Sequence, residues 1–180
     1  MSNPRIAASV LRRARGVRLM AFDVDGVMTD GRLWYGPSGE QLKAFHVADG
    51  LGVKLIARAG VRTAILSARR SRALARRAAE LGIDELVMGA EDKREAFARL
   101  LARARLQPAD AGYMGDDLVD LPVLRRCGFA AAPASAQPMV RRHVHYVARA
   151  GGGEGAVREV CELVLHAKGA QAAAMAEYLR

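Results

Sequence analysis

Cysteine and aromatic residues are scarce in this chain of 180 residues. The two cysteines, Cys127 and Cys161, are far apart and have no metal-type spacing. We therefore expect both thiols to be reduced, buried and inert. Long apolar runs are also missing, because no stretch approaches the roughly 20 residues of a membrane span, and the N-terminus has no long apolar core of a signal peptide. We expect a cytoplasmic protein with no membrane partner.

Acidic residues are outnumbered by basic ones, 19 against 28, which gives a formal net charge of +9. A basic excess can indicate nucleic-acid binding. Here the arginines are spread along predicted helices, as in SARRSRALARRAAE, with almost no aromatic residues between them to stack on bases. We therefore expect no nucleic-acid partner, and a positive field that attracts an anionic substrate.

Short apolar runs alternate with longer helical patterns, which predicts an α/β fold: a Rossmann-like parallel sheet with helices on both faces. The length favours one domain, residues 1–180. Strands are predicted at 18–23, 62–66, 85–88 and 111–114, with edge strands at 129–132 and 145–148. Helices are predicted at 49–58, 70–81, 93–105, 118–126 (interrupted near Pro122) and 156–167. The segments 33–35 and 42–47 flank turn residues 36–39 and predict a β-hairpin. Residues 170–180 are expected to be a mobile tail or an arm on a neighbouring chain.

Asp23 is the last residue of the first predicted strand, and Asp25 lies just beyond it, in the segment FDVDGVMTD. Ligands of open α/β sheets bind beyond the carboxyl ends of the strands. Once the chain has left the strand, the second carboxylate can turn back toward the pocket of the first. One could then attack phosphorus while the other passes a proton to the leaving oxygen. A solvated acidic loop is the alternative for this segment alone.

The run DVDGVMTDG resembles the first motif of the haloacid dehalogenase superfamily of phosphatases, and three later segments match that family in order. Ser67 ends a predicted strand, Lys93 opens a helix, and GDDLVD follows another strand. The resemblance implies the fold of this superfamily. It also implies that Asp23 is the nucleophile, that Asp25 is the general acid and base, and that Ser67 and Lys93 hold the transferring phosphoryl group.

The same resemblance implies a Mg²⁺ cofactor. The carboxylates of Asp23 and Asp116 and the main-chain carbonyl of Asp25 would hold it, since hard oxygen ligands suit a hard ion. Asp117 and Asp120 are expected to orient the metal-bound water and the lysine of the third motif.

Segments such as TDGRLWYGPSGEQLKAFHVADGLGVKLI and GGGEGAVREVCELVL are similar to the 3-deoxy-D-manno-octulosonate 8-phosphate phosphatases, across residues 15–169. This family acts in lipopolysaccharide sugar synthesis. The resemblance implies a small anionic sugar-phosphate substrate and a hairpin cap at about 31–47. It further implies a homotetramer whose hairpins and C-terminal segments close neighbouring sites. The glycines at 151–153 are expected to form a flexible crossing toward a partner subunit.

The substrate-facing loop implied by this resemblance contains Lys43, Asp49 and Gly50. Arg69 and Arg76 are candidates to bind the substrate carboxylate, because a guanidinium pairs with it bidentately. For Arg76 a solvated helix face is an equal alternative.

The sequence departs from the family pattern in or near substrate-facing segments, at His46, Ala48, Ala68 and Glu154. One alternative function is therefore a phosphatase for a sialic-acid-like nine-carbon 9-phosphate. Another is a catalytically silent tetramerisation module, which could dispense with Asp25 or the lysine of the third motif.

Overall fold

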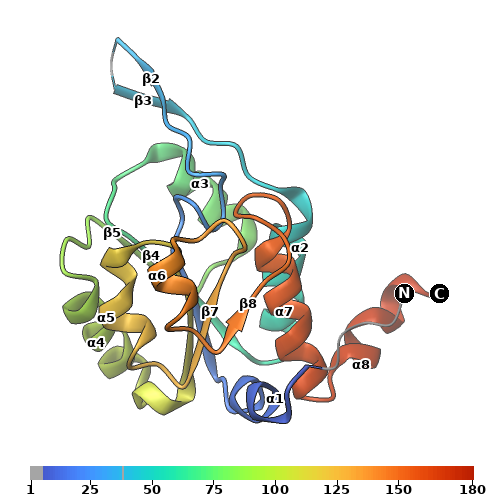
Figure 1. Cartoon of the computed structure of the whole chain (residues 1–180). Helices are drawn as coiled ribbons and strands as arrows, with labels where there is room; N and C mark the ends of the chain where they lie inside the picture. The colour runs from blue at the N-terminus through green and yellow to red at the C-terminus, as the bar shows by residue number, and fades with distance from the viewer. Residues whose placement is uncertain (1–5, 38) are drawn as a thin grey trace.

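A parallel β-sheet forms the middle layer of the computed structural model, which describes residues 6–37 and 39–180 (Figure 1). Over these residues the sheet has six strands in the order β5-β4-β1-β6-β7-β8. Their bounds are β1 Leu19–Phe22, β4 Arg62–Ser67, β5 Glu85–Met88, β6 Ala111–Met114, β7 Phe129–Ala132 and β8 Tyr146–Val147. The central strands β1, β6 and β7 are buried along their whole length, which explains their continuous apolar sequences.

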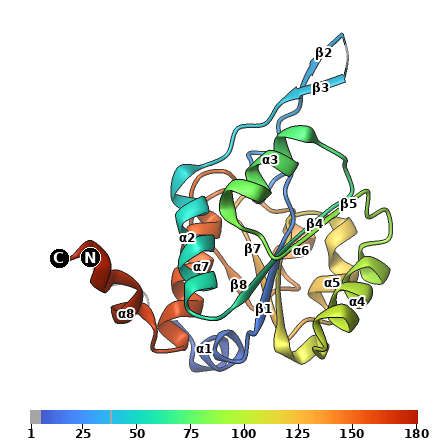
Figure 2. The ribbon, with the colours of Figure 1, turned by 180° about the vertical axis from the view of Figure 1, so that it is seen from behind.

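Helices cover both faces of the sheet (Figures 1 and 2). On one face a hydrophobic cluster joins the sheet to α1 (Ala8–Arg15), α2 (Val47–Arg58), α3 (Arg72–Leu81) and α7 (Ala156–Ala167). On the other face a second cluster joins it to α4 (Lys93–Ala104), α5 (Leu121–Leu124) and α6 (Pro138–Arg141). The predicted α/β class with a parallel sheet is confirmed. None of the helices in the described part of the chain is long and apolar enough to span a bilayer.

The predicted hairpin is present as β2 (Trp34–Gly36) and β3 (Gly39–Leu42), which project away from the sheet (Figures 1 and 2). The predicted second strand at 42–47 is wrong in its bounds. The backbone pairs Gly36 with Gly39, so the strand begins at the glycine expected in the turn, and α2 already starts at Val47. Ser38, also expected in the turn, lies outside the described residues.

Three other elements differ from the prediction, one in its place in the sheet and two in their bounds. The strand β7 is not an edge strand, because it pairs with both β6 and β8. The helix α3 begins at Arg72, since Ser71 is extended and its Oγ accepts a hydrogen bond from the Leu74 N–H as the N-cap. The segment predicted as an interrupted helix is a 3₁₀ turn, η2 (Leu118–Asp120), followed by α5, so the break precedes Pro122.

The C-terminal segment expected to be a mobile tail contains α8 (Gln171–Met175) and a 3₁₀ turn, η3 (Ala176–Tyr178). Arg58 of α2 forms an ion pair with Glu177 and donates a hydrogen bond to the Tyr178 hydroxyl. These contacts join the segment to α2 of its own chain, and the alternative of an arm on a neighbouring chain stays a prediction. Helix α1, α6 and a further 3₁₀ turn, η1 (Pro108–Asp110), were not predicted.

Candidate active site

Strand register brings three polar side chains to one edge of the sheet. Strand β1 pairs in parallel with β4 on one side and β6 on the other. Asp23, Ser67 and Asp116 therefore leave the sheet at the same carboxyl-terminal edge. Asp23 and Ser67 are 7% and 2% exposed, so both polar groups stand at the top of the core and not on an open surface.

Lys93 joins this edge from the first turn of α4, and its side chain is almost completely buried. Its Nζ lies 2.9 Å from Asp23 Oδ1 and 2.6 Å from Asp120 Oδ1. A buried ammonium group needs such partners to offset its desolvation. The result is a fixed positive charge against the side chain of Asp23.

Asp120 is fully buried and accepts hydrogen bonds on both carboxylate oxygens. Its Oδ1 accepts from Lys93 and, at 2.7 Å, from the Tyr113 hydroxyl. Its Oδ2 accepts from the backbone N–H groups of Asp116 and Asp117, at 3.0 and 3.2 Å. Asp120 therefore orients both the lysine and the loop that presents Asp116, which agrees with the orienting position expected for it.

The acidic cluster fits a divalent cation. Carboxylate oxygens of Asp23, Asp116 and Asp120 lie within 4.8 Å of one another. Because both oxygens of Asp120 already accept two hydrogen bonds each, Asp23 and Asp116 are the carboxylates of this cluster that remain available to a metal. Asp116 Oδ1 is buried without a hydrogen-bond partner among the described residues, and such a group usually has a ligand, water or ion. Hard oxygen donors of this kind suit Mg²⁺.

The electrostatics of the site also favour a cation. Burial raises the pKa of Asp23 to about 6, with a further rise from Asp120 and an opposing effect of Lys93. Burial raises the pKa of Asp116 to about 7, and the neighbouring Asp23 and Asp120 carboxylates add to it. Burial disfavours the charge of Lys93, but Asp23 and Asp120 outweigh this cost and raise its pKa. The cluster holds more negative charge than one ammonium group neutralises.

Asp25 lies beside this cluster and contacts two cations. Lys43, from the segment after β3, forms an ion pair with Asp25 Oδ1, and Arg69 Nε lies 3.6 Å from Asp25 Oδ2. The Arg69 backbone N–H donates to Ser67 Oγ, and its guanidinium donates to the Tyr35 hydroxyl at 3.1 Å. Four of the predicted site residues are therefore brought together, and the hairpin contributes to the arrangement through Tyr35.

Asp49, Gly50 and Arg76 are not brought to this group. The Asp49 carboxylate is 1% exposed and accepts a hydrogen bond from the Arg158 backbone N–H at the start of α7. A Cβ on Gly50 would lie 2.2 Å from a guanidinium nitrogen of Arg77. These two residues of α2 therefore serve packing against α7 and α3. Arg76 is an exposed residue of α3.

Asp117 and the triple glycine also differ from expectation. Asp117 is exposed, and its side chain accepts from the Leu118 N–H as the N-cap of η2, so only its backbone contacts the buried network. Gly152 and Gly153 pack against residues 26–30 of their own chain. A Cβ on Gly152 would lie 1.8 Å from the Gly26 carbonyl oxygen, and the Gly153 N–H donates to the Val27 carbonyl.

Two residues of the site were missed from the sequence, Tyr113 and Tyr35. Tyr113 had a detectable signal, because it is a hydroxyl-bearing residue in the otherwise apolar buried strand AGYM, directly before the acidic motif. Tyr35 lies on an exposed hairpin, and its contact with Arg69 depends on how the hairpin is placed. Nothing in the local sequence indicates that contact.

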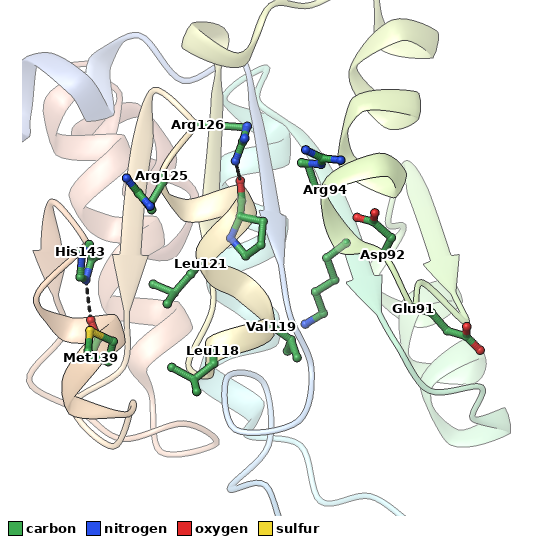
Figure 3. Close-up of a pocket in the computed structure, with 12 residues that line it drawn as sticks. Glu91, Asp92, Arg94, Leu118, Val119, Leu121, Arg125, Arg126, Met139 and His143 are labelled. Atoms are coloured by element: carbon green, nitrogen blue, oxygen red, sulfur yellow. Dashed lines mark hydrogen bonds between the residues drawn. The ribbon is translucent and has the colours of Figure 1, made fainter.

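Two hollows flank the cluster. One of about 930 Å³ lies between α4 and the segment from η2 to α5, with exposed Leu118 and Val119 on its wall (Figure 3). Lys93 lines it, but the carboxylates of the cluster do not. A second, of about 520 Å³, is lined by Tyr35, Ala68, Arg69, Arg70, Gly89 and Glu91. In this second hollow an anionic ligand would meet the Arg69 guanidinium, which contacts Asp25.

Both cysteines are free and buried, as expected. Burial raises the pKa of Cys127 to about 12 and raises that of Cys161 as well, so both remain protonated thiols.

Comparisons with known proteins give close relatives. No family model matches the chain. The chain is 45% identical over 163 residues to the 3-deoxy-D-manno-octulosonate 8-phosphate phosphatase KdsC of Yersinia pestis, an alignment covering 91% of this chain and 87% of that protein.

Solved structures of phosphatases with the same substrate name also resemble this chain. The Moraxella catarrhalis 3-deoxy-D-manno-octulosonate 8-phosphate phosphatase, in complex with a magnesium ion, a phosphate ion and a KDO molecule, is 37% identical with a TM-score of 0.91, covering 94% of this chain and 97% of that one. The cobalt-bound phosphatase of Haemophilus influenzae is 40% identical with a TM-score of 0.86, covering 88% and 93%.

Proposed function

The chain belongs to the family of 3-deoxy-D-manno-octulosonate 8-phosphate phosphatases, and on that premise we propose that it hydrolyses this eight-carbon sugar-acid phosphate to the free sugar acid and phosphate. The observation that carries the proposal is the buried Asp23, which lies 2.9 Å from Lys93 and clusters with Asp116. A phosphate monoester is anionic, so a carboxylate can approach it only where cations offset the repulsion. This edge of the sheet meets that requirement.

In the proposed reaction an Asp23 oxygen attacks phosphorus, and the bond from phosphorus to the sugar oxygen breaks. The pKa of Asp23, raised to about 6 mainly by burial, leaves the carboxylate ionised at neutral pH. Asp25 gives its proton to the departing sugar oxygen, then removes a proton from the water that attacks the aspartyl-phosphate. Phosphate is released and the Asp23 carboxylate is restored. Lys93 and the Ser67 hydroxyl hold the phosphoryl oxygens during both steps.

A bound Mg²⁺ would be held by Asp23 and Asp116, together with the main-chain carbonyl of Asp25, and would supply a further positive charge against the phosphoryl group. The unpartnered Asp116 Oδ1 supports this assignment.

We assign recognition of the sugar acid to Lys43 and Arg69. Both cations contact Asp25, and Arg69 lines the hollow beside it. An anionic substrate that takes over these two contacts releases the Asp25 carboxyl, which can then carry the proton for the leaving oxygen. Arg76 has weaker support, because it is exposed on α3, and the buried Asp49 and Gly50 are left out of the proposal.

We further propose that the chain is one phosphatase domain, with residues 31–47 as its cap, and that it works in the cytoplasm as a homotetramer. The hairpin supports the assembly, since Trp34, Tyr35 and Leu42 are each more than half exposed there. Light scattering of the purified protein tests the tetramer directly.

Steady-state phosphate release from the eight-carbon 8-phosphate and from a nine-carbon sugar-acid 9-phosphate tests the proposed activity. We expect kcat/KM to be at least about ten-fold higher for the eight-carbon compound with Mg²⁺, and activity to disappear with a chelator. A preference for the nine-carbon compound would assign the other sugar. Failure to release phosphate from any small phosphomonoester would point to a silent module.

A further inference from the structure

Tyr113 is a fully buried residue of β6 that the proposed reaction does not use. Its hydroxyl donates to Asp120 Oδ1 at 2.7 Å. The same oxygen accepts the ammonium of Lys93 at 2.6 Å. Two donors, one neutral and one charged, therefore share a single carboxylate oxygen behind the phosphoryl site.

The shared oxygen affects where the lysine charge lies. Lys93 Nζ is closer to Asp120 Oδ1 than to Asp23 Oδ1, at 2.6 against 2.9 Å, so Asp120 competes with the nucleophile for the ammonium. A hydroxyl that also donates to Asp120 Oδ1 withdraws part of its negative charge and limits its rotation. Both effects leave more of the Lys93 charge directed at Asp23.

We propose that Tyr113 is a positioning residue for phosphoryl transfer: through its hydrogen bond to Asp120 it holds the Lys93 ammonium against the Asp23 nucleophile. The inference rests on the proposed function. Tyr113 itself touches neither the substrate nor the reacting atoms. It acts through Asp120, whose other oxygen fixes the backbone of the acidic loop.

The environment of Tyr113 suits this role. Burial, reinforced by the nearby Asp120 and Asp23 charges, raises its pKa well above the ordinary value, so the hydroxyl keeps its proton. The ring packs edge-on against Phe97, with 5.9 Å between centroids. A phenylalanine at position 113 can keep that ring contact and remove only the oxygen. The substitution Tyr113→Phe therefore isolates the hydrogen bond.

Tyr146→Phe is a matched control. The Tyr146 hydroxyl donates to a carboxylate oxygen of Glu159 at 2.6 Å, on the edge strand β8 and away from the acidic cluster. For Tyr113→Phe we expect kcat to fall about ten-fold, the effect of losing one hydrogen bond to a charged group, with KM changed by less than about two-fold. For Tyr146→Phe we expect both constants to stay at the wild-type values.

A double-mutant cycle separates positioning from a general structural role. If Tyr113 acts through Asp120, then Tyr113→Phe costs nothing further in a chain that already carries Asp120→Ala, which removes both acceptor oxygens. An equal loss of kcat in both backgrounds, or no loss in the single variant, overturns the proposal. Melting curves with Mg²⁺ establish that each variant is folded at the assay temperature.

A spectroscopic measurement keeps the inference testable apart from activity. The chain has four lysines, so the ¹⁵N spectrum of their ammonium groups is simple, and Lys93 is buried and bound by the carboxylates of Asp23 and Asp120. We expect its signal to shift in Tyr113→Phe and to stay unchanged in Tyr146→Phe. An unchanged signal in Tyr113→Phe overturns the proposal. If Tyr113→Phe fails to fold, Asp120→Asn must shift the same signal. If wild-type protein released no phosphate, the proposed function would fail while this spectrum still tested the contact.

Discussion

Substituting Gly26 by alanine is expected to weaken magnesium binding strongly while the fold is kept. Gly26 has φ +89°, and a Cβ built on it would lie 2.1 Å from Asp116 Oδ2 and 2.6 Å from Asp116 Cγ. Non-bonded heavy atoms rest at about 3.5 Å, so the Asp116 carboxylate must move by about 1 Å. The left-handed backbone adds about 1 kcal/mol of strain for a residue with a Cβ.

The displacement is large on the scale of metal coordination. Mg²⁺ requires oxygen ligands at about 2.1 Å in near-ideal geometry, so a shift of about 1 Å removes Asp116 as a ligand. Disturbing even the groups that orient a ligand costs about 10- to 100-fold in metal affinity. We expect Gly26→Ala to weaken Mg²⁺ binding at least that much by isothermal titration calorimetry. Phosphate release should fall in parallel and recover in part at high Mg²⁺ concentration.

Gly60→Ala is the matched control for backbone strain. Gly60 has φ +83°, and within the described part of the chain no heavy atom beyond residues 59–61 lies within 4 Å of the position that a Cβ would take there. We expect this variant to lose about 1 kcal/mol of unfolding free energy and to keep wild-type Mg²⁺ affinity. If Gly26→Ala binds Mg²⁺ like the wild type, or if Gly60→Ala loses affinity equally, the proposed contact with Asp116 does not govern metal binding.

Three further outcomes are expected. Asp23→Asn should lower phosphate release by at least about 1,000-fold without lowering the melting temperature; near-normal turnover would disprove the nucleophile. Arg69→Ala should raise KM about ten-fold, whereas Arg76→Ala should leave it unchanged, and equal effects in the two kinetic assays would contradict the substrate assignment. The pKa values of Asp23 and Asp116 in the folded state are raised to about 6 and about 7. The protonated carboxyls therefore stabilise the metal-free fold at low pH, and this contribution is lost as the pH rises through these two values. Mg²⁺ should therefore raise the melting temperature more at about pH 8 than at about pH 5, and an equal rise at both would refute the linkage.

The parts of the site that follow directly from strand ends were predictable from the sequence. Asp23, Ser67 and Asp116 each follow a short apolar run, and parallel strands place their carboxyl ends at one edge. Lys93 was predictable only through the resemblance to the third motif of the haloacid dehalogenase superfamily, because a lysine that opens a helix after a strand is by itself more often a surface residue. The hydrogen bond from Tyr113 to Asp120 was not predictable, since it joins β6 to η2 across a turn.

The residues whose surroundings were not predicted from the sequence have one physical feature in common, a contact with a distant part of the chain. The sequence places Asp49 at the start of a predicted helix. In the structure its carboxylate accepts a hydrogen bond from the backbone N–H of Arg158, 109 positions later. The glycines at 152 and 153 read as a flexible loop, but they are small because the backbone of residues 26–30 lies against them. Such contacts depend on how the first and last thirds of the chain meet, which local propensity does not encode.

This arrangement has a consequence for biosynthesis. Gly152 and Gly153 pack against residues 26–30, which follow Asp23 and Asp25. The buried Asp49 carboxylate accepts its hydrogen bond from the backbone N–H of Arg158. A polypeptide still emerging from the ribosome would have its first strand and its nucleophile long before either partner has been translated. The enzyme should therefore acquire its metal only after residues 152–158 have been translated, and a nascent chain that stops before them should not hydrolyse phosphate esters.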